Sequence, residues 1–211
     1  MIMNKNTRFW IVLAALLTAS AVLALLAPEE AMLGRAIRII YVHVSLTWVG
    51  MLGLMAAGVL GVVVLAVNKP RLQRLMLIIG WVGYGFYTAG VAFSMIASDI
   101  SWGAVFMQEP RMAAALNMVA TGLIVMIVIT FLSPSRFTGV LPPAYAVLLL
   151  VATFGAELVL HPRNPIKNSS STAIQLTFLG MTVIYGLTAV WIIIHWQATS
   201  GKSQAASGKL E

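Results

Sequence analysis

The sequence contains no cysteine, and this absence removes several kinds of chemistry at once. Without a thiol, the chain forms no disulfide, binds no metal through thiolate and has no cysteine nucleophile. Charged residues are also scarce, at 9% of 211 residues against about 25% in ordinary soluble domains. With 60% hydrophobic residues and a mean hydropathy of +0.95, the chain has too little polar surface to coat a water-soluble globule. We therefore expect an integral membrane protein.

Acidic residues are the scarcer charged type, with six Asp and Glu against thirteen Lys and Arg, so the formal net charge is +7. The positive charges are spread along the chain and form no basic run. Phosphate recognition usually needs a clustered basic patch, so no nucleic-acid partner is expected. In a membrane protein, such charges instead orient the chain in the bilayer.

Six apolar segments are long enough to cross the hydrocarbon core, which needs about 20 residues per helix. The breaks between them are rich in Pro, Asn, Ser and Asp, which favour turns. The sequence therefore predicts an all-α polytopic membrane protein, with one membrane domain over residues 1–211. A polar tail follows at 197–211, and its last part, 203–211, is expected to be disordered. The expected spans are about 9–27, 39–67, 75–97, 112–132, 141–160 and 173–196.

An even number of spans places both termini on one side of the membrane. The loops after the second and fourth spans lie on the same side as the termini. This side holds eight of the thirteen Lys and Arg. Because short cytoplasmic segments are enriched in Lys and Arg, both termini are predicted to be cytoplasmic. The loops after the first, third and fifth spans are then external.

Two of the three histidines are predicted to lie at similar depth near the external face. His43 lies about one turn inside the second span, and His161 ends the fifth span. Each is also compatible with an ordinary hydrogen-bonded interfacial histidine. As a pair on facing helices, they suit the two axial positions of a haem iron, whereas zinc or copper would need further ligands that are not evident nearby. His195 ends the sixth span at the opposite face and is predicted to be an interfacial anchor.

The external loop after the third span, residues 101–112, reads SWGAVFMQEPRM. An apolar loop facing water is expected either to cover something or to lie on the membrane surface. Several arginines share this face, among them Arg38 and Arg111. They are either ordinary interfacial charges or, if haem is bound, partners for its two propionates.

Small residues in the second span repeat every four positions, at Gly53, Ala57 and Gly61. Such spacing lets helices approach closely in lipid. The alternative is that these residues leave room for a flat ligand beside His43.

Three segments together resemble the CcmC-type (CcmC/CcsA) cytochrome c assembly family. Residues 38–44 read RIIYVHV, residues 102–111 read WGAVFMQEPR, and Leu160-His161 opens another external loop. The six spans, the cytoplasmic ends and the order of these features match as well, over about residues 34–196.

The resemblance implies a haem-handling membrane protein of cytochrome c biogenesis, without enzymatic activity of its own. Haem b would be transiently bound at the external side of a bacterial cytoplasmic (inner) membrane, with His43 and His161 as the iron ligands. The family's tryptophan-rich (WWD) signature, WGTWWVWDxR, maps onto residues 102–111, so Trp102, Phe106 and Arg111 are expected haem contacts. Arg38 is expected to contact a propionate of the bound haem. The implied partners are ABC-type subunits and a periplasmic haem chaperone.

The loop departs from that signature. Trp102, Gly103 and Arg111 are present, but Val105, Phe106 and Gln108 replace the central tryptophans and Glu109 replaces the aspartate. Flat aromatic area and indole N–H donors are lost with them. The chain therefore resembles a divergent member of this family. The alternative is a haem-free structural subunit of an ABC-type membrane complex.

Overall fold

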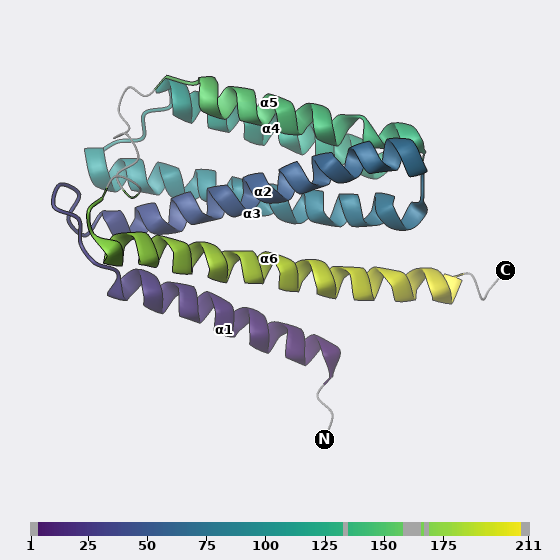
Figure 1. Cartoon of the computed structure of the whole chain (residues 1–211), viewed down its shortest axis with the longest axis horizontal. Helices are drawn as coiled ribbons and strands as arrows, with labels where there is room; N and C mark the ends of the chain where they lie inside the picture. The colour runs from purple at the N-terminus through teal and green to yellow at the C-terminus, as the bar shows by residue number, and fades with distance from the viewer. Residues whose placement is uncertain (1–3, 133–134, 158–165, 167–168, 208–211) are drawn as a thin grey trace.

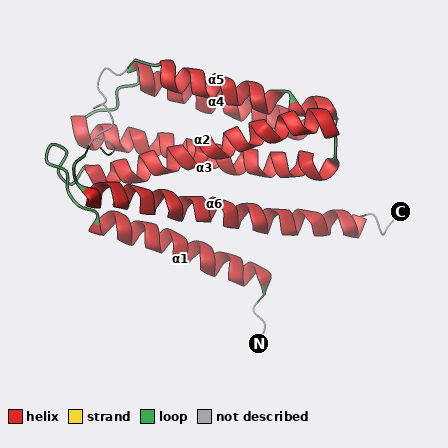
Figure 2. Ribbon diagram, viewed as in Figure 1, coloured by secondary structure: helices red, strands yellow, loops and turns green. Residues whose placement is uncertain are grey.

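The computed structural model describes residues 4–132, 135–157, 166 and 169–207; for 201–207 it describes the backbone alone. Within these ranges the chain forms six α-helices, one short 3₁₀ helix and no β-strand, which confirms the all-α prediction (Figures 1 and 2). The elements are α1 Lys5–Leu26, α2 Ile37–Val67, α3 Pro70–Trp102, α4 Pro110–Phe131, η1 Arg136–Gly139, α5 Leu141–Gly155 and α6 Thr172–Ser207.

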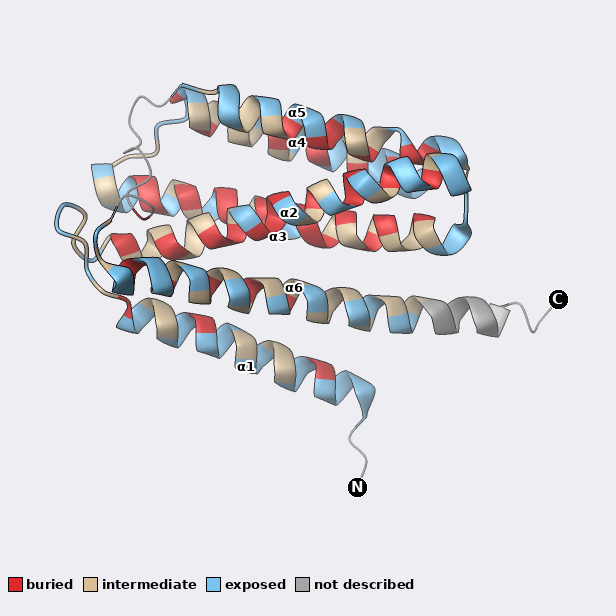
Figure 3. Cartoon of the chain, in the orientation of Figure 1, coloured by how far each residue is buried: buried red, intermediate tan, exposed pale blue. Residues whose placement is uncertain are grey.

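All six helices, α5 taken together with η1, are long and apolar enough to cross a membrane. Figure 3 shows most of α1 as exposed or half-buried, and in a membrane these largely apolar residues face lipid rather than water. The chain is therefore a multi-pass membrane protein. The start of α1 and the end of α6 lie toward the same end of the bundle, as an even number of spans requires (Figure 1). We call the opposite end, which holds the α1–α2 and α3–α4 connections, the distal end.

Three helices differ most from the predicted spans. Helix α3 is longer at both ends, because Pro70 supplies the fixed φ that suits a first helical turn and Gly103 takes the left-handed conformation (φ 75°) that ends a helix. Helix α5 ends at Gly155, five residues early, so Glu157 is exposed beyond the helix rather than inside a span. Helix α6 continues to Ser207, so 203–207 are helical where disorder was expected; no proline follows Pro165 to stop it.

Helices α2 and α3 form the antiparallel centre of the bundle, with α4 and α5 on one side and α6 and α1 on the other (Figure 1). The small residues of α2 pack against their neighbours. A Cβ on Gly53 would lie 2.8 Å from the Cα of Gly83, and one on Gly61 would lie 2.7 Å from the carbonyl oxygen of Gly139. Neither glycine lines the cavity beside His43 described below. Close helix packing is therefore what these residues provide.

The pairing of α5 with α2 leaves the distal end of α2 uncovered by α5. Gly58 packs against Ala146, and three residues further along, Gly61 packs against Pro143. The two helices are antiparallel, so each residue further along α5 lies beside a residue one position earlier in α2. Gly155, the last residue of α5, therefore lies about level with Val49. The part of α2 from 37 to 48 therefore extends past α5 by about 18 Å. This mismatch opens a space at the distal end of the bundle.

Candidate functional site

A cavity of about 600 Å³ occupies that distal space. Its wall is formed by α2, α3, α4, α5 and α6, together with Leu33 and Ile166 from the connections. The volume lies within the range of about 300–1,000 Å³ that is usual for cofactor and ligand sites. No Asp or Glu of the described chain lines it, whereas Arg111 and His43 do. The cavity is therefore largely apolar, with one formal positive charge.

The cavity ends at a packed floor. Met51 and Tyr87 line its deep end, and beyond them Leu54, Tyr84 and Leu149 belong to a buried cluster. The Tyr84 hydroxyl donates to the Val119 carbonyl at 3.1 Å, which ties this cluster to α4. Along α3, the lining residues extend from 102 back to 87, which is about 22 Å of helix. The cavity thus reaches from the distal surface into the hydrocarbon depth of the bundle.

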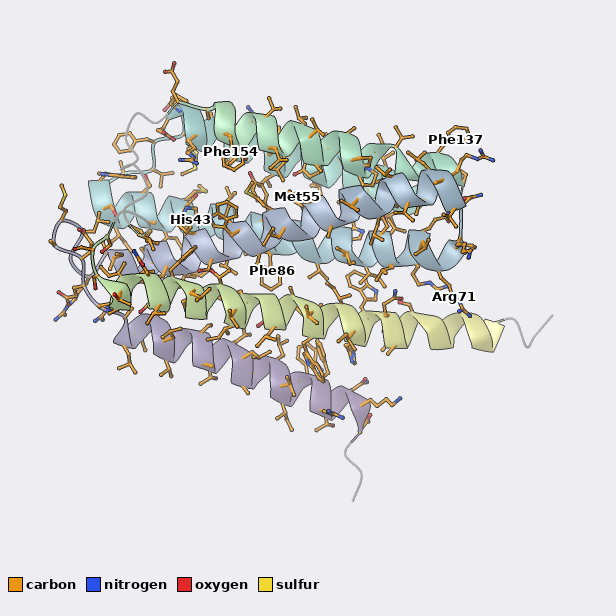
Figure 4. The ribbon with its side chains drawn as sticks, in the orientation of Figure 1. His43, Met55, Arg71, Phe86, Phe137 and Phe154 are labelled. Carbon is orange, nitrogen blue, oxygen red and sulfur yellow. The ribbon has the colours of Figure 1, made fainter. Side chains whose placement is uncertain are left out.

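His43 lies on α2 with its ring in the wall of this cavity, in the distal half of the bundle that also holds Phe154 (Figure 4). Its Nδ1 is 2.8 Å from the carbonyl oxygen of Gly90 on α3. A carbonyl oxygen can only accept, so Nδ1 carries the proton and donates it. In the neutral ring the lone pair is then on Nε2. Metal-ligating histidines are commonly held in this way, through a hydrogen bond from the other ring nitrogen to a backbone carbonyl.

Trp102 and Arg111 are brought to the same cavity from the two ends of the α3–α4 connection. Trp102 is the last residue of α3, and Arg111 is the second residue of α4; both line the cavity together with His43. Arg111 forms no ion pair with any residue that the structure describes. The cavity therefore brings both ends of this loop together with His43.

Phe106 and Arg38 are placed differently, and neither lines the cavity. The ring of Phe106 is on the surface of the α3–α4 connection, with 39% of the residue exposed. Arg38 lies on α2 with Nη2 4.0 Å from Glu29, whose carboxylate also accepts from Arg35 at 2.8 Å. Arg38 therefore belongs to a charged group at the α1–α2 connection rather than to the wall around His43.

His161 falls in 158–165, outside the described residues. His195 lies on α6 far from the cavity, and its ring stacks on Phe9 of α1 with the centroids 4.0 Å apart. Trp191 adds a hydrogen bond from its indole N–H to the Phe9 carbonyl at 3.2 Å. His195 is thus part of the contact between α1 and α6, and it does not share a site with His43.

Glu109, the acidic residue of the loop, caps α4. Its carboxylate accepts from the backbone N–H of Met112 at 2.7 Å, Pro110 occupies the first turn, and Glu109 is 7% exposed. An acid before Pro at a helix start is a signal that the sequence contained. The acid of this loop therefore has a structural function, whatever else it contacts.

Replacing this cap is expected to destabilise the protein without changing the cavity. Glu109→Ala removes the acceptor and the favourable charge at the helix N-terminus, which costs about 0.5–2 kcal/mol. Thermal unfolding in detergent measures the loss as a lower midpoint. Gln108→Ala, at the exposed neighbouring position, is the control and should unfold like the wild type. Equal midpoints for both variants would show that the cap contributes nothing.

Sequence reasoning assigned no residue of α3 between 87 and 101 to the site. Tyr87, Val91, Ser94, Ser98 and Ser101 all line it, at the spacing of one helical face. That spacing was present in the sequence, but three serines in a transmembrane helix do not by themselves distinguish a cavity wall from a helix contact. The hydrogen bond from His43 to the Gly90 carbonyl was missed for a different reason, because the two residues are 47 positions apart.

A scan against protein-family models found no match for the chain, and a search of curated proteins found none either. The assignment of a function therefore rests on the residues and the geometry above.

Proposed function

We propose that the chain is a haem-binding membrane protein of cytochrome c maturation. It holds haem b transiently at the external face of the bacterial inner membrane, with His43 and His161 as the axial ligands. It passes the haem to a periplasmic haem chaperone, together with ABC-type subunits, and catalyses no reaction itself. The observation that carries the proposal is a membrane-embedded histidine, oriented by a backbone carbonyl, in the wall of a 600 Å³ cavity.

The residues around His43 fit a large, flat, mostly apolar group with acidic edges. The apolar wall and floor suit a macrocycle, and Trp102 supplies an aromatic ring at the cavity mouth. Arg111 is suited to a propionate because it lacks an ion-pair partner among the described residues and can form charge-assisted hydrogen bonds. It also lies in the first turn of α4, where the helix dipole favours an anion nearby.

The chain on both sides of His161 supports its assignment as the second ligand. Phe154, seven residues before it, and Ile166, five residues after it, both line the cavity. A bare metal ion is less well supported, because no group of three or more His, Asp or Glu that could hold one occurs among the described residues. Two histidines suffice for haem, since the porphyrin supplies the other four ligands.

An optical spectrum of the purified protein, oxidised and then reduced with dithionite, tests the proposal. We expect a sharp Soret band and low-spin b-type reduced bands, either as purified or after haemin is added. His161→Ala should replace the low-spin spectrum with a high-spin one, because only one protein ligand remains. Absence of any haem spectrum in the wild type, even with added haemin, would refute the proposal.

One observation favours a second candidate, a haem-free structural subunit of an ABC-type membrane complex. Of the loop's rings, only that of Trp102 lies at the cavity, since Phe106 is on the surface. The loop therefore supplies less aromatic area than the family signature would. A wild-type protein that binds no haem but co-purifies with an ATP-hydrolysing subunit would support this candidate.

A further inference from the structure

The imidazole of His43 is fixed by groups from two helices. The Gly90 carbonyl of α3 accepts from Nδ1 at 2.8 Å, and the hydroxyl of Thr47, one turn along α2, lies 3.4 Å from the same nitrogen. We propose that Gly90 and Thr47 are positioning residues. They hold His43 in the tautomer with Nε2 unprotonated, and through it they set the haem affinity and the reduction potential of the iron. The part that concerns iron rests on the proposed function, whereas the part that concerns the tautomer does not.

The hydroxyl of Thr47 is arranged to accept rather than donate at Nδ1. Its proton is committed to the carbonyl oxygen of His43, 2.8 Å away, which is the usual hydrogen bond of a threonine to the preceding helical turn. The lone pairs of the oxygen remain for Nδ1–H. At 3.4 Å this second contact is weak, so the Gly90 carbonyl is the main acceptor. Both groups nevertheless favour the same proton position.

The short distance between His43 Nδ1 and the carbonyl oxygen of residue 90 requires glycine at that position. A Cβ there would lie 2.7 Å from the backbone nitrogen of Thr47 and 2.9 Å from its Cα. Backbone atoms cannot move aside as the end of a side chain can, so Gly90→Ala must push α2 and α3 apart at this level. The carbonyl oxygen of residue 90 would then withdraw from Nδ1 of His43. Gly90 therefore provides both the space and the acceptor.

The consequence for a bound iron follows from the basicity of the ligand. A hydrogen bond from Nδ1–H to a carbonyl makes Nε2 a stronger donor, and its loss typically costs about 10- to 100-fold in metal affinity. A stronger donor favours ferric over ferrous iron. Weakening the bond should therefore raise the reduction potential, by about 59 mV for each tenfold loss of ferric preference.

The test uses four variants of the full-length protein: Gly90→Ala, Thr47→Val, Thr47→Ser and Gly83→Ala. Gly83→Ala is the matched control. A Cβ at Gly83 would lie 2.8 Å from the backbone nitrogen of Leu54, so this variant also crowds the contact between α2 and α3. Gly83 lies two turns from Gly90 and away from His43. Thr47→Val keeps the shape but removes the hydroxyl, and Thr47→Ser restores it. Two quantities are measured: the ¹⁵N signals of the His43 ring in haem-free protein, assigned with His43→Ala, and the reduction potential of haem-loaded protein.

We expect wild-type His43 to show a protonated Nδ1 and an unprotonated Nε2. Gly90→Ala should shift this pattern most and raise the potential, Thr47→Val should do so less, and Thr47→Ser and Gly83→Ala should resemble the wild type. Unchanged ring signals in Gly90→Ala, or equal changes in Gly90→Ala and Gly83→Ala, would overturn the proposal. If Gly90→Ala does not fold, the comparison of Thr47→Val with Thr47→Ser decides. If the wild type binds no haem, the proposed function fails, while the ring signals still decide the tautomer.

Discussion

His43→Ala is expected to weaken haem binding strongly and to remove the low-spin spectrum. The variant removes the proposed axial ligand from the wall of the cavity, whereas losing only a hydrogen-bond partner of a metal ligand costs about 10- to 100-fold in affinity. The loss for the ligand itself should therefore be at least about 100-fold. We would measure it by titrating haemin into purified protein under reducing conditions and following the Soret band.

The matched control is His195→Ala, the same substitution at the opposite end of the bundle. His195 stacks on Phe9 and does not line the cavity, so its loss should weaken the α1–α6 contact and leave the haem spectrum intact. If His43→Ala binds haem with wild-type affinity and spectrum, His43 is not an iron ligand. If both variants lose haem equally, the effect of His43→Ala comes from the fold rather than from ligation.

The fold was predictable from the sequence to a large extent, because hydropathy alone reports which segments can cross a bilayer. The number of helices and their approximate positions follow from this signal. The ends of the helices do not, because they depend on local chemistry. Gly103 ends α3 through its positive φ, and Gly155 ends α5 although the apolar composition continues beyond it. The early end of α5 has the larger consequence, since it leaves the space that forms the cavity.

The candidate site was predictable only in part. The order of spans predicted that His43 and both ends of the α3–α4 connection share the distal end, and the cavity joins His43, Trp102 and Arg111. Depth in the membrane does not fix the rotation of a side chain about its helix. Arg38 lies five residues before His43 on α2, yet it interacts with Glu29 outside the cavity. The fold also decides which backbone carbonyl meets a histidine, so Gly90 could not be assigned from its own sequence context.

Filling the cavity is expected to block ligand binding without unfolding the protein. Ala115 and Met112 line the cavity from α4. The methyl side chain of Ala115 forms no hydrogen bond, so replacing it leaves the hydrogen bonds of His43 in place. An Ala115→Trp side chain would occupy space that a flat ligand needs. Overpacking a closed core usually costs about 1–3 kcal/mol. A cavity of about 600 Å³ has room for an indole, so the midpoint of thermal unfolding should stay the same or rise.

Ala120→Trp, on the exposed face of the same helix, controls for adding an indole to α4. We expect it to bind haemin like the wild type, whereas Ala115→Trp should bind at least about tenfold more weakly, a difference of about 1.4 kcal/mol. Normal binding by a stable Ala115→Trp would mean that the ligand lies outside this cavity, even if His43 is essential. Together with His43→Ala, this pair separates two claims that one variant cannot: that His43 ligates the iron, and that the space between α2, α3 and α4 holds the macrocycle. Loss in both His43→Ala and Ala115→Trp, with both controls intact, is the pattern that a ligand buried beside His43 requires.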